Sequence, residues 1–423
     1  MTTLRLSGKI SYGLLAFPLA FAGLPLYIHA PDFYAVEYGA SLAFLGGALF
    51  VIRLFDALVD PFIGRMSDKY HPQRGLIMAA AGAVFAGAFA ALYNPPPSVE
   101  IFWFVCSAFL ATLSFSVLLI NLNAVGALAA GDAAGKTSLS AWREGFGLAG
   151  LLTAMILPAL LGDMPRYALA GAFCALLASA VFFVWYRSLS LRVPAGSTSQ
   201  LPFRNLMTPD FRRFFAVYGI SMLASSLPAV LFLFYVRDWL DAEDKAGLFL
   251  MIYFAAAIVS VPLWQKAVKH FTPERVWMCG MGLSAAFLCA AAFIGPGDVQ
   301  IYAAICLLTG IGFGAEIFLP PALLSRRIAA AGMDAHTSSY FGIYAFFMKM
   351  SLAAATALAF ITLDIAGFKP AADSPDCGHA ALVVLYAMIP AAIKLFAIFV
   401  LVKTEKNHET SSHHLHTGGH HAA

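Results

Sequence analysis

Charged side chains are scarce in this chain of 423 residues: Asp, Glu, Lys and Arg make up only 12% of it, against 61% apolar residues. A soluble globular domain usually carries about 25% charged residues. Because a folded chain of this size still exposes much of its surface, a soluble core could not bury so many apolar side chains. The composition therefore excludes a soluble protein and indicates a chain surrounded mainly by lipid.

Cysteine is also scarce, with six residues, and none of them has the CxxC or Cys/His spacing of a zinc or iron–sulfur site. The chain contains neither GxSxG nor a P-loop, and its longest internal polar segment is too short to form a soluble catalytic domain. These absences argue against a metalloenzyme, a membrane-embedded hydrolase and an ATP-driven pump. We expect no enzyme activity and no cofactor.

What the chain has in abundance is apolar runs of about 20 residues, the length that crosses a bilayer as a helix. Short polar segments separate the runs. We expect no cleavable signal peptide, because residues 11–30 lack a small-residue cleavage site and another span follows. We predict an all-α membrane protein with twelve transmembrane helices, near residues 10–30, 38–64, 75–93, 100–129, 139–161, 166–187, 213–236, 246–265, 274–295, 299–324, 338–362 and 379–402.

The longest internal polar segment, Ser188–Arg213, is rich in proline and arginine and has six predicted spans on either side. Such a segment is typical of the linker between two six-helix halves of a transporter. We therefore predict an N-terminal bundle, a cytoplasmic linker and a C-terminal bundle, at residues 1–187, 188–212 and 213–403.

The last segment, residues 404–423, holds six of the eleven histidines together with Ser, Thr and Gly. It has no apolar periodicity, so we predict a disordered cytoplasmic tail. Metal binding by the histidines is the alternative interpretation.

Lysine and arginine are distributed unevenly between the two sides of the predicted membrane. If both termini are cytoplasmic, eighteen of these residues lie in cytoplasmic segments and four in outer segments. Positive loops stay on the cytoplasmic side during insertion, so the bias favours this orientation. We predict a multi-pass plasma membrane protein, in the inner membrane of a bacterium, that acts as a monomer. The net charge of +3 follows from this topology and does not indicate a nucleic-acid partner.

The second predicted span carries three charged residues, Arg53, Asp56 and Asp60. Their spacings of three and four place them on one helical face. Ionisable groups within spans are costly and usually serve function, and neighbouring carboxylates favour binding of a proton or a hard cation such as Na⁺. We predict a cation site at Asp56 and Asp60, with Arg53 neutralising one of them. The alternative is an Arg–Asp pair that only tethers helices.

The segment from Arg53 to Asp68, RLFDALVDPFIGRMSD, resembles the helix-2 signature of the glycoside–pentoside–hexuronide:cation symporters, the melibiose permease family. Ser11-Tyr12-Gly13 at the start of the first span is similar as well. So are the short basic loops after spans 2 and 8, which are a hallmark of the major facilitator superfamily. The resemblance implies that superfamily's fold and a coupling cation, Na⁺ or H⁺, held by Asp56 and Asp60.

Two further cations match positions of this family. The resemblance implies that Arg143, at the start of span 5, lies near the sugar site. It also implies that Lys349, within span 11, lies near the cation site, where it could pair with a helix-2 carboxylate and link cation occupancy to a conformational switch. For both side chains the alternative is a position at the membrane interface, with the charge extended towards water.

The sugar-binding acids of melibiose permease have no counterpart here. Ala20 stands at the first position, and span 4 offers Asn121 and Asn123 in place of a carboxylate. We retain Asn121 as a substrate-binding candidate. Glu316 in span 10 is another, although it could instead bind a proton or pair with a lysine. Lys394 in span 12 is interpreted as a partner for a neighbouring helix.

These features predict a secondary active transporter that couples Na⁺ or H⁺ to the symport of a small solute, a sugar or glycoside, by alternating access. Its partners would be the solute, the coupling cation and membrane lipid. A less polar or amphiphilic solute such as a lysolipid remains an alternative, as does an uncoupled facilitator of the same fold.

Overall fold

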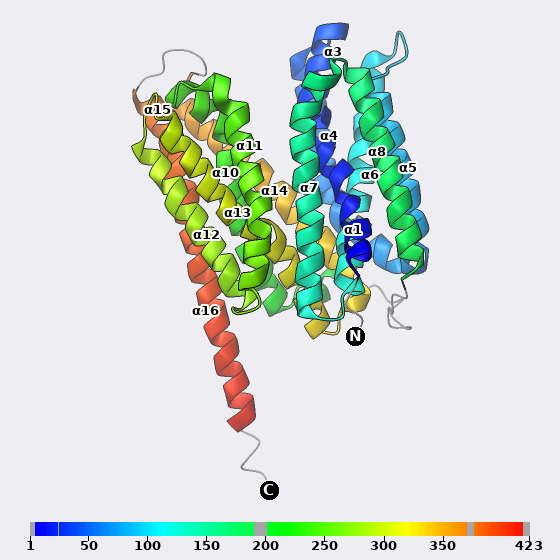
Figure 1. Cartoon of the computed structure of the whole chain (residues 1–423), viewed down its shortest axis with the longest axis vertical. Helices are drawn as coiled ribbons and strands as arrows, with labels where there is room; N and C mark the ends of the chain where they lie inside the picture. The colour runs from blue at the N-terminus through cyan, green and yellow to red at the C-terminus, as the bar shows by residue number, and fades with distance from the viewer. Residues whose placement is uncertain (1–4, 24, 190–200, 370–375, 418–423) are drawn as a thin grey trace. The chain divides into compact units, whose positions relative to one another are not determined.

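The computed structural model describes residues 5–23, 25–189, 201–369 and 376–417, and within these ranges it is helical throughout, with no strand (Figure 1). The predicted all-α class is therefore confirmed. The helices of the first half are α1 (Leu6–Leu14), α2 (Ala16–Phe21), α3 (Ala30–Tyr38), α4 (Leu42–Lys69), α5 (Arg74–Leu92), α6 (Glu100–Ala129), α7 (Ala133–Leu161) and α8 (Met164–Arg187).

The second half begins with the short helix α9 (Phe203–Leu206), followed by one long helix for each predicted span. Two of these spans contain a single turn of π-helix, η3 (Tyr235–Trp239) and η7 (Val384–Met388). The remaining helices are α10 (Pro209–Phe234), α11 (Ala246–Ala267), α12 (Pro273–Ala290), α13 (Val299–Ala330), α14 (Thr337–Ile365), α15 (Asp376–Val383) and α16 (Ile389–Thr417).

Nine helices of the described ranges are long and apolar enough to cross a membrane. The three predicted spans outside this set are the first span, α4 and α7. The first is interrupted between α1 and α3, where Pro18 and Pro25 each lack the backbone N–H that a continuous helix would use. The other two are long helices, Leu42–Lys69 and Ala133–Leu161, that carry charged residues within their length. Each of the twelve predicted spans nevertheless corresponds to helical structure.

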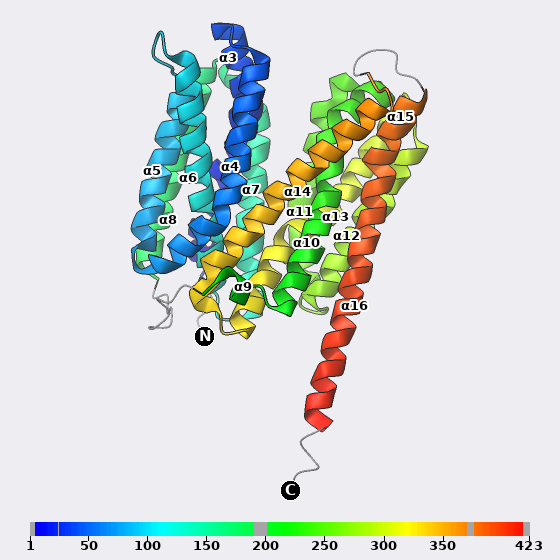
Figure 2. The same cartoon turned by 180° about the vertical axis from the view of Figure 1, so that it is seen from behind.

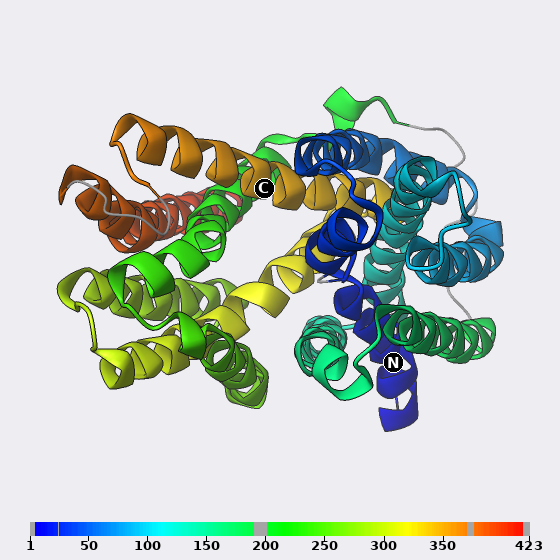
Figure 3. The same cartoon turned by 90° about the horizontal axis from the view of Figure 1, so that it is seen from above.

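The chain divides into two compact units, each with its own hydrophobic core. Unit 1 comprises residues 1–202, 261–269 and 317–349, and unit 2 the remainder. Figure 3 shows helices of the first half, coloured blue to teal, close to end-on. Unit 1 differs from the predicted N-terminal bundle because it includes parts of α11, α13 and α14. The reason lies in close packing between α4 and the first half of α14.

Figure 2 shows α14 beside the C-terminal half of α4, and glycines lie at the points of closest approach. A Cβ atom at Gly64 of α4 would lie 2.3 Å from the carbonyl oxygen of Ser338, and one at Gly342 of α14 would lie 2.5 Å from that of Asp60. Real Cβ atoms essentially never come so near, so these two backbones touch only because both positions are glycine.

The structure differs from the predicted boundaries at both polar segments. Residues 190–200 of the predicted linker lie outside the described part. The rest of the linker contains α9 and the start of α10. Helix α10 begins at Pro209, and proline is suited to the first turn of a helix. At the C-terminus, α16 continues as helix to Thr417, where we predicted disorder. Residues 404–417 contain neither Gly nor Pro, the residues least compatible with a helix interior.

Candidate cation-coupling site

The two carboxylates predicted from α4 lie within unit 1, where Lys349 of α14 contacts both. Its Nζ atom is 2.5 Å from Asp56 Oδ2 and 2.7 Å from Asp60 Oδ2. Asp60 is fully buried and Asp56 is 4% exposed. The spacing of one helical turn puts both acids on the face of α4 that meets α14, and the glycine contacts bring the lysine within reach.

A hydroxyl group from α6 completes this cluster. Ser116 donates a hydrogen bond to Asp56 Oδ1 at 2.5 Å, and its oxygen accepts one from Lys349 Nζ at 2.7 Å. Asp60 Oδ1 has no hydrogen-bond partner within the described residues. Three oxygen-bearing side chains thus surround one ammonium group, and oxygen atoms are the ligands that hard cations prefer.

The buried cluster contains two carboxylates and one ammonium, so it carries one negative charge when all three are ionised. An uncompensated charge within a membrane span is costly, and a bound proton or Na⁺ would remove it. Across the described ranges, no group of three or more His, Cys, Asp or Glu side chains is arranged to hold a metal ion. The single excess negative charge of this cluster is one that a monovalent cation would balance.

Arg53 was predicted to neutralise one of the two acids. It lies on α4 one turn before Asp56, but its side chain is exposed, whereas both acids are buried. The cation that contacts both acids is Lys349, whose side chain is 16% exposed. We therefore place Arg53 at the edge of this cluster and Lys349 at its centre.

The predicted substrate residues of unit 1 have different partners. Arg143 is 4% exposed and pairs with its neighbour Glu144; Tyr12 and Tyr344 also interact with it electrostatically. Asn121 is fully buried, and its amide group donates to Ser67 Oγ at 2.9 Å and to the carbonyl oxygen of Val117. Asn121 thus belongs to a different network from Arg143.

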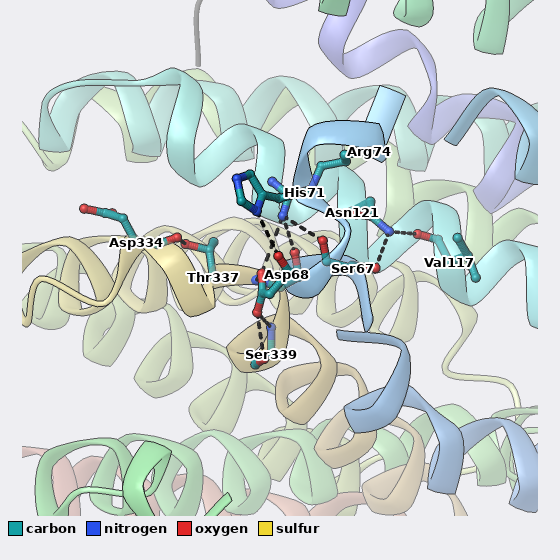
Figure 4. A network of polar contacts seen from close by, with 10 residues as sticks. Ser67, Asp68, His71, Arg74, Val117, Asn121, Asp334, Thr337 and Ser339 are labelled. Carbon is teal, nitrogen blue, oxygen red and sulfur yellow. Dashed lines mark hydrogen bonds and ion pairs between the residues drawn. The ribbon is translucent and has the colours of Figure 1, made fainter. Parts of the chain in front are cut away.

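That second network joins the C-terminal end of α4 to the start of α14 (Figure 4). Asp68 accepts hydrogen bonds from the backbone N–H of Ser338 at 2.8 Å and of Ser339 at 2.7 Å, and from the Ser339 hydroxyl at 2.7 Å. Arg74 donates to Ser338 Oγ at 2.8 Å. The first amides of a helix lack partners within it, so Asp68 caps α14 from another helix and its charge complements the helix dipole.

We expect Asp68→Asn to loosen the first turn of α14. The amide oxygen can replace only part of a carboxylate that accepts three hydrogen bonds from the first turn of α14 and one from Arg74, and bonds to charged groups contribute about 1.5–3 kcal/mol each. Hydrogen exchange at Ser338 and Ser339 should therefore accelerate by at least about 10-fold. Asp132→Asn is the matched control, since Asp132 caps α7 through Gly135. Equal acceleration at Ser338 and Ser339 in both variants would contradict this role.

The remaining candidate, Glu316 of α13, lies in unit 2. It is fully buried and pairs with Lys394 of α16, which is 3% exposed. Lys394 also donates to Ser225 Oγ of α10 at 2.8 Å, and the Ser225 hydroxyl lies 3.3 Å from Glu316 Oε2. The interpretation of Lys394 as a partner for a neighbouring helix agrees with this contact.

Two members of these clusters, Ser116 and Ser225, were absent from the sequence prediction. Serine is common within apolar helices, where it usually bonds a carbonyl oxygen one turn back, as Ser114 does with Leu110. Neither residue type nor spacing marks Ser116 as different. Ser116 is distinguished only by its contacts with Asp56 and Lys349, which lie on other helices.

The sequence profile described as "MFS/sugar transport protein" matches residues 9–405, nearly the whole chain. The protein therefore belongs to this family of the major facilitator superfamily, and its all-helical structure agrees with that fold. It is a multi-pass membrane transporter, and the predicted relationship to the glycoside–pentoside–hexuronide:cation symporters is confirmed.

Two relatives illustrate the relationship. An uncharacterized symporter of Bacillus subtilis, YjmB, is 23% identical over 98% of this chain and 96% of its own length. A putative glycoside/cation symporter of Escherichia coli, YagG, is 24% identical over 59% of this chain and 58% of its own length.

Solved structures of transporters share the fold at lower identity. An outward-facing bacterial homologue of the iron transporter ferroportin superimposes with a TM-score of 0.73 at 16% identity, over 95% of this chain and 100% of that one. The Escherichia coli fucose:proton symporter FucP superimposes with a TM-score of 0.66 at 15% identity, over 93% of this chain and 97% of that one. At these identities the likeness concerns the fold alone.

Proposed function

We propose that this protein is a symporter that couples Na⁺ or H⁺ entry to uptake of a small sugar or glycoside. The observation that carries the proposal is the contact of Lys349 with two buried carboxylates, Asp56 and Asp60. One ammonium leaves one negative charge, which supplies affinity for a cation. Relatives named as symporters, one of them a glycoside/cation symporter, support the same conclusion.

In this proposal the coupling cation and the Lys349 ammonium compete for the same oxygens. A second positive charge at about 4 Å would repel the ammonium by roughly 4 kcal/mol at a protein surface dielectric. Cation entry therefore weakens the link between α4 and α14, and loss of the cation restores it. Such a link, made in one state and broken in another, is what alternating access between two halves requires.

We also propose that both termini are cytoplasmic.

Uptake into proteoliposomes tests this proposal. Neutral sugars and glycosides, organic anions and lysophosphatidylcholine would each be offered under an inward Na⁺ gradient, an inward H⁺ gradient, or neither. We expect a neutral sugar or glycoside to accumulate above its external concentration under one gradient only. Equal uptake without any gradient would indicate a facilitator. Accumulation of the lysolipid alone would replace the sugar assignment, and the absence of acids at Ala20 and Asn121 makes this control necessary.

A further inference from the structure

The ion pair of unit 2 is a second buried polar cluster, and its charge differs from that of the first. Glu316 and Lys394 are both almost fully buried, and Ser225 contacts both. One carboxylate faces one ammonium, so the cluster is neutral. A buried pair of this kind is rarely favourable for stability alone, because removing both charges from water costs about as much as their attraction returns. Within a membrane span it suggests a functional role.

Neutrality decides which ligand this cluster suits. The Asp56–Asp60–Lys349 cluster has an excess negative charge and attracts cations, whereas the Glu316–Lys394 pair has none and would gain little from either ion. It does offer a strong acceptor beside a strong donor. Glu316 Oε1 has no hydrogen-bond partner within the described residues, although it is buried. An unpaired carboxylate oxygen in such surroundings is costly unless a ligand donates to it.

Two aromatic rings lie beside this pair. Tyr253 of α11 stacks on Phe313 of α13, with ring centroids 5.2 Å apart and planes 29° apart. Phe313 precedes Glu316 by three residues and so lies on the same face of α13. Tyr253 interacts electrostatically with Glu316. Both rings are only half-buried, so each keeps surface that a ligand could cover.

We infer that Glu316, Lys394 and Ser225 recognise neighbouring hydroxyl groups of a neutral sugar, while Tyr253 and Phe313 contact its apolar C–H face. A hydroxyl group both donates and accepts, so a pair of them can satisfy Glu316 Oε1 and share the ammonium of Lys394. The inference rests on the proposed symport function and specifies its substrate class. It assigns hydroxyl recognition to unit 2, whereas positions Ala20 and Asn121 of unit 1 lack the acids that would provide it.

The test uses the full chain in detergent and measures thermal stabilisation by three p-nitrophenyl glycosides: the β-glucoside, the β-xyloside and the negatively charged β-glucuronide. The informative variant is the double substitution Glu316→Gln and Lys394→Gln, which keeps side-chain size and neutrality and leaves no lone buried charge. Thr309→Val is the matched control on α13, because the Thr309 hydroxyl bonds only carbonyl oxygens of its own helix.

For the wild type, we expect a neutral glycoside to bind at least about 10-fold more tightly than the glucuronide. The double variant should retain the unliganded melting temperature and lose about 10- to 100-fold in affinity for that glycoside, since two bonds to charged groups are replaced. Thr309→Val should bind as the wild type does. Unchanged affinity in the double variant, a preference for the glucuronide, or failure of both neutral glycosides to bind would overturn the inference.

The outcome is separable from that of the coupling proposal. If glycoside binding depends on Glu316 and Lys394 but uptake ignores Na⁺ and H⁺, the coupling proposal fails and the sugar site stands. If uptake of a glycoside follows a cation gradient and the double variant transports it with an unchanged KM, the coupling proposal stands and the sugar site fails.

Discussion

Asp60→Asn is expected to abolish accumulation of solute against its gradient while the protein still inserts and folds. The substitution leaves one carboxylate and one ammonium in the cluster, so its excess negative charge disappears. At about 4 Å this charge attracts a cation by roughly 4 kcal/mol, which corresponds to about three orders of magnitude in affinity. Accumulation in proteoliposomes under the Na⁺ or H⁺ gradient that drives the wild type should fall at least about 100-fold.

Two comparisons make this result specific. Asp163→Asn, at an acid 40% exposed beside the start of α8, should leave accumulation unchanged. Exchange of labelled for unlabelled solute at equal concentrations needs no driving cation, so it should persist at a measurable rate in Asp60→Asn. If accumulation in the variant equals that of the wild type, Asp60 does not hold the coupling cation.

The cation cluster was predictable from the sequence because charge is rare within apolar spans. Asp56 and Asp60 are conspicuous in α4, and Lys349 in α14. The positions of the spans along the chain were predictable as well, since each span needs about 20 apolar residues. The family resemblance was needed to connect Lys349 with α4, because the two segments are far apart in the chain and no local pattern relates them.

Sequence reasoning was less successful where contacts arise from close packing. Arg53 was assigned to an acid on spacing alone, and its side chain is exposed, so its pairing with an acid stays a prediction. Asn121 stays a substrate-binding prediction, and its hydrogen bond to Ser67 Oγ could not be read from the sequence. Ser116 and Ser225 carried no signal. The contacts of these side chains depend on which helix packs against their own, and the sequence does not show that.

The glycine contacts between α4 and α14 should be as important as the charges that they bring together. Gly342→Ala adds one methyl group, whose carbon would lie 2.5 Å from the carbonyl oxygen of Asp60 and 3.1 Å from Pro61 Cα. Backbone atoms cannot move aside singly, so the two helices must separate by several tenths of an ångström to about 1 Å. Lys349 lies two turns further along the same face of α14, and its 2.7 Å contact with Asp60 would lengthen.

We expect Gly342→Ala to reduce cation-driven accumulation by about 100-fold, the effect typical of a 1 Å displacement at a functional site. Gly47→Ala is the matched control, because a Cβ at Gly47 of α4 meets nothing within 4 Å. It adds the same methyl group to a helix and favours helix formation by about 1 kcal/mol, so accumulation should be unchanged. Melting temperature, measured for both variants, separates loss of coupling from loss of folding. Wild-type accumulation in Gly342→Ala would show that the close approach of α4 and α14 is not needed for coupling.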